Sequence, residues 1–257
     1  LALTNVFGEV PVVNSQQPDF ELASMPHTKF LALSILFSIG MVRSPASAQT
    51  IPSPYTYIEN HQELAFFVGK SNIDAGKLKL GPRDSDTFGA RYSVGLGGAI
   101  SVDVSGTLFK STRLIQDVRR PIDDRTIDRG DIDLLLFDVR IRLNLTGRRM
   151  WHGFQPFLTF GGGFAFPYLV DNGAEEVAFM RSEDRYVFGV RFTGTTSGGT
   201  MFHVSRKLSL RVEGMLNLWQ IKTPIGWFAL ENDPLRLFSE SEWVTAQSIM
   251  LGASWRF

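Results

Sequence analysis

The sequence predicts an all-β protein: an eight-stranded antiparallel up-and-down transmembrane β-barrel, preceded by a cleavable signal peptide. Three observations lead to this fold class. Stretches in which apolar side chains alternate with small or polar ones recur along the chain, and a period of two is that of a strand with two different faces. The connections between these stretches alternate in length. An apolar segment with a small-residue boundary precedes the first stretch.

The start of the chain has the pattern of a targeting segment. A basic start and an apolar run are followed by the small-residue site Ala46-Ser47-Ala48, which is the order of a secretory signal peptide. We expect cleavage between Ala48 and Gln49. The expected division is a non-native upstream extension, a signal peptide, an extended leader and the barrel, at residues 1–24, 25–48, 49–61 and 62–257.

The composition excludes several classes of function. The chain of 257 residues has 26 basic and 26 acidic side chains and no cysteine. A balanced charge gives no support for binding nucleic acid through a basic surface. The absence of cysteine removes disulfides, thiol nucleophiles and thiolate metal ligands.

Eight alternating stretches are expected to form the wall. They are residues 62–70, 87–96, 99–110, 131–146, 154–166, 185–204, 208–222 and 242–257. The pair Gly97-Gly98 is typical of a tight hairpin, and the weakly patterned residues 194–200 predict a bulge. The charged residues 111–130 and the acidic residues 167–184 are interpreted as solvated loops.

The last strand carries the strongest pattern. Trp243, Ile249, Leu251 and Trp255 share one parity with the terminal Phe257, and the other parity is largely small or polar. A strand this long, with aromatic residues at both ends, is typical of a wall that faces lipid on one side. In the fourth stretch, the same reasoning predicts a lipid-facing set: Phe137, Val139, Ile141 and Leu143.

The topology follows from the connections. Their lengths run long, short, long, short, long, short, long, so both ends of the barrel domain fall on the short-turn side. Short periplasmic turns and long external loops are typical of an outer-membrane barrel. A closed sheet also leaves no unpaired edge in lipid. The predicted location is therefore the outer membrane.

Three stretches resemble the small outer-membrane β-barrel family that includes the OmpA transmembrane domain, OmpX and OmpW. They are residues 154–166 (FQPFLTFGGGFAF), 208–219 (LSLRVEGMLNLW) and 248–257 (SIMLGASWRF). The resemblance implies outer-membrane lipids, the assembly machinery and periplasmic chaperones as partners, with Trp255 and Phe257 as the assembly signal. In contrast to OmpA, we expect no peptidoglycan-binding domain after Phe257, and therefore no tethering to the cell wall.

Sites for catalysis or metal binding are weakly supported. His203, Ser205 and Glu213 resemble the active site of lipid A deacylases, in which Ser is the nucleophile, His the base and Glu orients it. A short turn on the periplasmic side argues against that chemistry, because lipid A lies in the outer leaflet. Five aspartates between Asp123 and Asp133 alternate with arginines, so self-neutralisation is preferred to a Ca²⁺ site. We expect no catalytic residue, cofactor or metal.

The inward parity carries charges that must be paired or hydrated. The predicted lumen charge network consists of Asp103, Asp138, Arg140, Arg142, Arg211 and Glu213. We expect Asp103 to pair with Arg142 or Arg140, Glu213 to be a second acceptor, and the network to plug a barrel just wide enough for its own side chains.

The predicted function is a non-enzymatic envelope structural or surface-interaction role. The alternatives are a narrow channel for small solutes and, below it, a lipid A-modifying enzyme. Trp227, Phe228 and Leu230 are the most adhesive residues of the last loop, although packing against the rim is the preferred interpretation of them.

Overall fold

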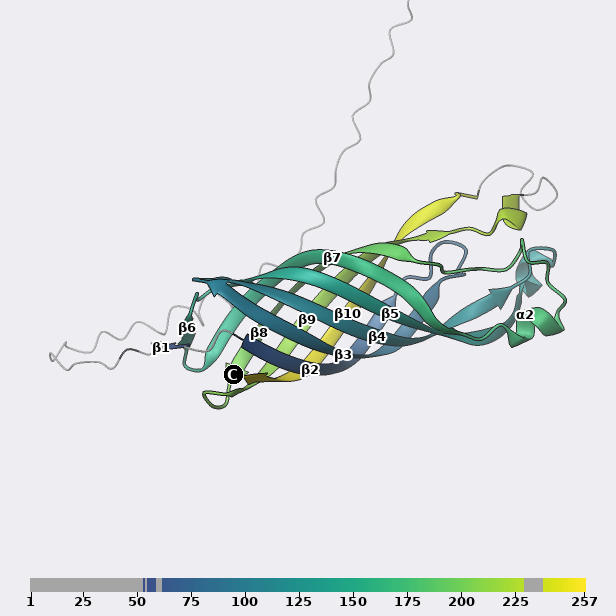
Figure 1. Ribbon diagram of the computed structural model, residues 1–257. Coiled ribbons are helices and arrows are strands. Elements are labelled where there is room, and N and C mark those ends of the chain that lie inside the picture. Colours follow the sequence, from purple (N-terminus) through teal and green to yellow (C-terminus); the bar gives the residue numbers. More distant parts are fainter. Residues whose placement is uncertain (1–52, 54, 59–61, 229–237) are drawn as a thin grey trace, which may run out of the picture. The chain divides into compact units, whose positions relative to one another are not determined.

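The computed structural model describes residues 53, 55–58, 62–228 and 238–257. Within them, eight long strands form a closed antiparallel barrel (Figure 1). Each of these strands pairs with the next along the chain, and β10 pairs with β2 to close the wall. The strands are β2 (Gln62–Ile73), β3 (Pro82–Gly97), β4 (Ile100–Gln116), β5 (Thr126–Asn144), β7 (Phe154–Val170), β8 (Arg191–His203), β9 (Leu208–Lys222) and β10 (Ser241–Arg256).

Short elements lie at the two ends of the barrel. At the short-turn end, β1 (Tyr55–Tyr57) pairs with β6 (Arg149–Trp151). The long loops carry η1 (Ile122–Asp124), α2 (Gly173–Val177) and η2 (Ile225–Phe228). Among the described residues, no helix is long and apolar enough to cross a membrane.

The predicted fold class is confirmed, but several strands are longer than the sequence pattern indicates. The interpretation of residues 111–130 as a loop is wrong at both ends, because β4 continues to Gln116 and β5 begins at Thr126. Residues 167–184 likewise contain the end of β7 and helix α2. The physical reason is that backbone pairing continues whatever the side chains are, and polar side chains are stable on a strand that has left the lipid.

The sixth predicted strand is also corrected. It begins at Arg191 and not at residue 185, and Tyr186 and Phe188 are buried side chains of the preceding loop. Residues 194–200 hold no bulge, since their pairing with β7 and β9 shows no register shift. Small residues weaken the apolar alternation there but leave the hydrogen-bonded ladder intact.

Glycines let β5 and β7 approach closely. A Cβ atom at Gly161 would lie 2.0 Å from the Val139 carbonyl oxygen and 2.6 Å from the Arg140 Cα. A side chain is therefore excluded beside Arg140, one of the charged residues of the lumen.

The two faces of the wall have opposite chemistry. Phe137, Val139 and Ile141 are 50%, 54% and 51% exposed on the outside, with Leu143 half-buried beside them. The intervening Asp138, Arg140 and Arg142 are buried inside. An apolar exterior around a charged interior is stable in lipid and reverses the pattern of a soluble protein. The closed wall is that of a transmembrane β-barrel.

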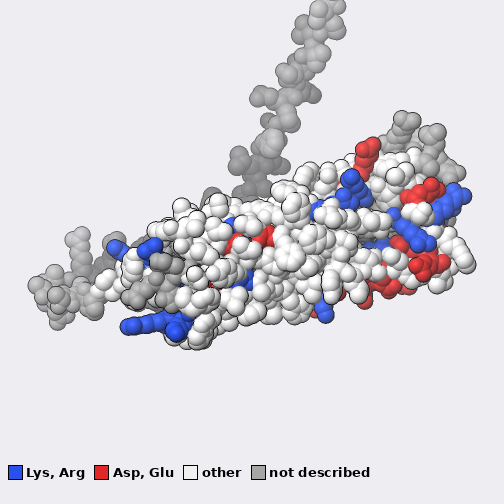
Figure 2. All heavy atoms as spheres, viewed as in Figure 1, with Lys and Arg blue, Asp and Glu red and all other residues white. Residues whose placement is uncertain are grey.

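A row of charges marks the edge of the apolar wall nearest the long loops. Lys70 is paired in register with Asp86, Asp86 with Lys110, and Lys110 with Asp133, all on the outward face. Beyond this row, β4 and β5 continue toward the long loops. Figure 2 shows a largely uncharged wall, with acidic and basic side chains gathered at the long-loop end.

Candidate functional site: the lumen and its short-turn mouth

The lumen is filled by inward-facing side chains of two kinds. Toward the long loops they are mainly apolar and form a buried cluster that includes Phe109, Leu134, Leu136, Phe188, Trp219 and Val244. Toward the short turns they are charged and also buried: Glu63, Arg91, Asp103, Asp138, Arg140, Arg142, Arg211, Glu213 and Arg256. The alternation of each strand places both sets inside, and the barrel brings them together across the lumen.

Glu213 lies at the centre of the charged set. Its carboxylate accepts hydrogen bonds from Arg91 Nη1 at 2.8 Å and Nη2 at 3.3 Å. Arg211 Nε lies 3.0 Å from Glu213 Oε2, and Arg140 Nη1 donates to Oε1 at 3.3 Å. Ser197 Oγ also donates to Oε1. One acceptor therefore joins guanidinium groups from β3, β5 and β9.

Asp103 lies among three arginines at longer distances. Its carboxylate oxygens are 3.6 Å from Arg142 Nε, 3.7 Å from Arg211 Nη2 and 4.0 Å from Arg91 Nη1. Neither oxygen has a hydrogen-bond partner among the described residues. The structure thus places Arg142, one of the two expected partners, beside Asp103.

Arg140 contacts a different aspartate. It is the register neighbour of Asp103, but its Nε lies 3.0 Å from Asp138 Oδ1. Its Nη2 donates to Ser105 Oγ at 2.6 Å, and that hydroxyl donates to Asp138. Asp138, Arg140, Ser105 and Glu213 therefore form one connected group.

The predicted network omits Arg91, Glu63 and Arg256. Glu63 Oε2 lies 3.8 Å from Arg142 Nη2 and 3.6 Å from Arg256 Nε. Strand alternation already assigns Arg91, like Arg191, to the lumen-facing set, and the same parity could have identified Glu63 and Arg256. The distances across the lumen could not have been obtained in this way.

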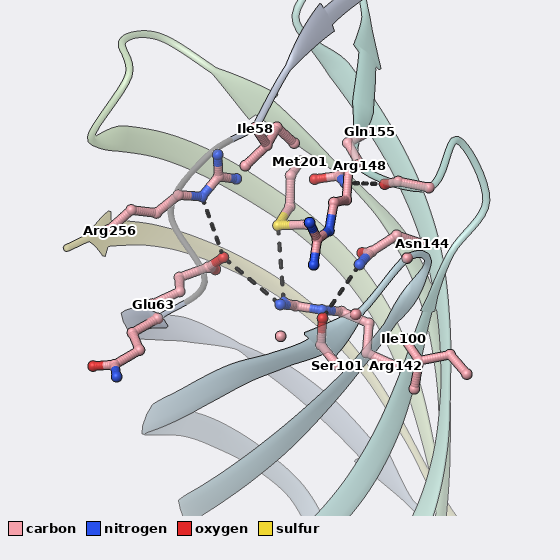
Figure 3. A pocket seen from close by; sticks show the side chains of 15 residues that line it. Ile58, Glu63, Ile100, Ser101, Arg142, Asn144, Arg148, Gln155, Met201 and Arg256 are labelled. Carbon is pink, nitrogen blue, oxygen red and sulfur yellow. Dashed lines mark hydrogen bonds and ion pairs between the residues drawn. The ribbon is translucent and has the colours of Figure 1, made fainter.

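A small pocket opens at the short-turn mouth (Figure 3). Its volume is about 50 Å³, and its lining includes Glu63, Arg142, Arg148 and Arg256. Polar side chains of Gln62, Ser101, Asn144 and Gln155 complete the wall, together with Met201 and Ile58. Glycines of the β3–β4 and β5–β7 connections form its rim.

The residues considered for lipid A deacylation do not form a nucleophilic site. His203 Nδ1 lies 2.7 Å from Ser209 Oγ, and its Nε2 lies 3.1 Å from Gln155 Oε1. Ser205 is exposed, and its hydroxyl accepts hydrogen bonds from the backbone of Lys207 and Leu208. Glu213 is bound by arginines. The three residues lie near one another in the sequence, but the fold gives each a different partner.

The remaining candidates are metal ligands and the apolar residues of the last loop. No group of three or more metal-ligating side chains occurs in the described part of the chain. Trp227 is 1% exposed and donates from Nε1 to the Asp184 carbonyl at 3.3 Å, so it is a buried anchor and not an adhesive residue. Phe228 is half-buried, and Leu230 lies outside the described residues.

The predicted ends of the mature protein are only partly described. Ala48, Gln49 and the two segments before them lie outside the described residues. Trp255 points outward and is 52% exposed. The Phe257 ring stacks on Tyr92 with centroids 6.5 Å apart. The role of Trp255 and Phe257 in assembly remains a prediction.

No protein-family model matches the sequence, and comparison with curated proteins finds no match. Solved structures with similar chains include the outer membrane protein OprG of Pseudomonas aeruginosa, with 10% identity and a TM-score of 0.47 over 78% of this chain and 98% of OprG. Neisserial surface protein A has 12% identity and a TM-score of 0.44, over 80% and 98% of the two chains. For outer membrane protein W of E. coli the values are 12%, 0.42, 78% and 100%. At these low values, the fold assignment rests on the strand pairing itself.

Proposed function

We propose that this protein is a sealed, non-enzymatic barrel with a role in surface interactions. It presents an ordered external cap, which consists of the β4–β5 loop and of the β7–β8 loop with its helix α2. The observation that carries the proposal is the filled lumen, in which an apolar cluster and a charged network follow one another along the barrel. A solute would have to displace large buried side chains such as Trp219, which is fully buried. This arrangement favours a structural or surface role over a narrow channel.

A larger hollow does not argue for a passage. Its volume is about 1,270 Å³, and most of the residues that line it face outward, including Lys70, Leu216 and Ile249. Buried inward-facing residues, among them Ser71, Ser197 and Met215, also line it.

One buried and one partly exposed ion pair hold the external cap. Arg113 on β4 lies 2.9 Å from Glu175 in α2, and its Nη2 donates to Asn172 Oδ1 at 3.0 Å. Arg119 in the β4–β5 loop lies 2.8 Å from Asp184 in the β7–β8 loop. Burial raises the pKa of Asp184, although the Arg119 guanidinium opposes the shift. These contacts join separate loops into one support.

Apolar side chains project from this support. Val177 is 79% exposed at the end of α2, and Phe179 is 91% exposed with φ of +50°. A phenylalanine in the left-handed region is uncommon and places strain in the backbone. Exposed apolar side chains on an ordered loop support a contact surface for an external partner.

Insertion of the barrel belongs to the same proposal. We infer that the assembly machinery reads Trp255 and Phe257, that periplasmic chaperones escort the unfolded chain, and that outer-membrane lipids contact the apolar wall. The outward position of Trp255 at the end of β10 supports this inference.

Conductance across a planar bilayer tests the proposal. We expect the purified protein to give no single-channel current, because large buried side chains such as Trp219 and Arg140 occupy the lumen. Regular current steps would establish the channel alternative. Turnover of lipid A by the same preparation, abolished in Ser205→Ala, would establish the enzyme alternative.

A further inference from the structure

We propose that the pocket at the short-turn mouth binds a small oxyanion, a phosphate or a carboxylate, between Arg142, Arg148 and Arg256. This binding site is separate from the external cap and does not depend on the cap's function.

The lining has an excess of positive charge. Three guanidinium groups and one carboxylate face the pocket (Figure 3). Glu63 lies between Arg142 and Arg256 and partly neutralises both, at 3.8 and 3.6 Å. Arg148 contributes a third positive charge, and its Nη1 donates to the Tyr57 hydroxyl at 3.3 Å. A second anion in the pocket would bring the local charge closer to balance.

Arg142 has donor capacity that the protein does not use. Its Nε is 3.6 Å from Asp103 Oδ1, its Nη2 is 3.8 Å from Glu63 Oε2, and its Nη1 is 4.0 Å from the Met201 sulfur. The contact of Nη1 is a weak hydrogen bond to sulfur, and the two N···O distances exceed the 2.7–3.2 Å range of an N–H···O hydrogen bond. The residue is only 4% exposed, and buried donors without a close acceptor are unfavourable. An oxyanion supplies the missing acceptor.

Arg256 is held beside the pocket by His203. Its Nη2 lies 2.8 Å from His203 Nδ1, and its Nε lies 3.6 Å from Glu63. Gln155, which contacts the other nitrogen of His203, also lines the pocket. The guanidinium is thereby fixed in place, which reduces the entropy lost when it binds an anion.

The size of the pocket limits the ligand. A cavity needs about 10–15 Å³ to hold one water molecule, so a volume of about 50 Å³ leaves room for a larger group. It accommodates a phosphate or carboxylate group but not a folded partner. Planar guanidinium groups bind both kinds of oxyanion with paired hydrogen bonds. The short-turn position implies that the ligand arrives from the periplasm.

Isothermal titration of the full-length protein in detergent tests the proposal. Sodium phosphate and sodium acetate are titrated separately at constant ionic strength. We expect saturable binding of at least one anion, and the preferred anion identifies whether the natural group is a phosphate or a carboxylate. If neither anion gives saturable heat, the proposal is wrong.

Variants distinguish binding in this pocket from a general electrostatic attraction of anions to the protein. Arg256→Gln and Arg148→Gln should each weaken binding at least about tenfold, which is about 1.4 kcal/mol. The matched control is Arg206→Gln, because Arg206 is exposed on the β8–β9 turn at the same end of the barrel and lies outside the pocket. Arg148 is only half-buried, so its variant keeps the test valid if Arg256→Gln does not fold. Equal weakening by the control would overturn the proposal.

Discussion

Arg91 and Glu213 join two strands that are not neighbours in the wall. Arg91 lies on β3 and Glu213 on β9, with β2 and β10 between them. The two hydrogen bonds from the guanidinium to the carboxylate, at 2.8 and 3.3 Å, therefore cross the lumen. This pair fixes the interior of the barrel in addition to the hydrogen bonds of the sheet.

Loss of the central acceptor should strongly destabilise the barrel. Glu213→Gln leaves Arg91, Arg140 and Arg211 without their shared carboxylate. Breaking a buried pair in this way costs about 3–5 kcal/mol. The measurement is reversible unfolding in lipid. Glu183→Gln is the control, because its carboxylate is half exposed and its ion pairs within the described residues are with exposed arginines; its loss should cost roughly 0–1 kcal/mol. Equal costs for the two variants would contradict a central role for Glu213.

Asp103→Ala should also lower stability, but by less than Glu213→Gln. Its ion pairs are 3.6–4.0 Å long and include no direct hydrogen bond among the described residues. The same variant distinguishes two explanations of the seal in a planar bilayer. If the charged network alone plugs the barrel, conductance should rise. We expect no current from Asp103→Ala, because the apolar cluster around Trp219 still blocks the lumen.

Charge on the outer wall should be tolerated only outside the lipid. Ile141→Arg is expected to destabilise the barrel by about 2–4 kcal/mol at the bilayer midplane and by less toward an interface. Ile225→Arg introduces the same side chain at an 81% exposed position in the last loop, and should change stability by about 0.5 kcal/mol or less. Unfolding in lipid measures both. Equal tolerance would show that Ile141 does not face lipid.

The ion pair between Arg113 and Glu175 of α2 should protect the β7–β8 loop from protease. Arg113→Met leaves Glu175 buried without its partner at 2.9 Å, so the loop should open more often. Trypsin should then cleave faster after the exposed Arg181. Arg129→Met removes an exposed arginine from β5 and is the control, for which no change is expected. An unchanged rate of cleavage in Arg113→Met would show that this ion pair does not hold the loop closed.

The sequence by itself determined the barrel and the two faces of its wall. Strict alternation along β10 separates Trp243, Ile249 and Leu251 from Val244 and Ala246, and this pattern assigns the outer and inner faces without any knowledge of neighbours. The alternating lengths of the connections then predict the antiparallel order. Both inferences depend on local periodicity, which is a property of consecutive residues.

Only the tertiary structure decided which charges meet and where the strands end. The register places Asp103 opposite Arg140, but Arg140 instead contacts Asp138 and Glu213. The partners of Arg140 depend on the carboxylate of Glu213 in β9. Glu213 is distant in sequence, and closure of the barrel sets its position. The ends of β4 and β5 depend on backbone pairing, which carries no side-chain pattern. The apolar part of the lumen, toward the long loops, likewise forms where inward residues of several strands meet buried loop residues such as Phe188.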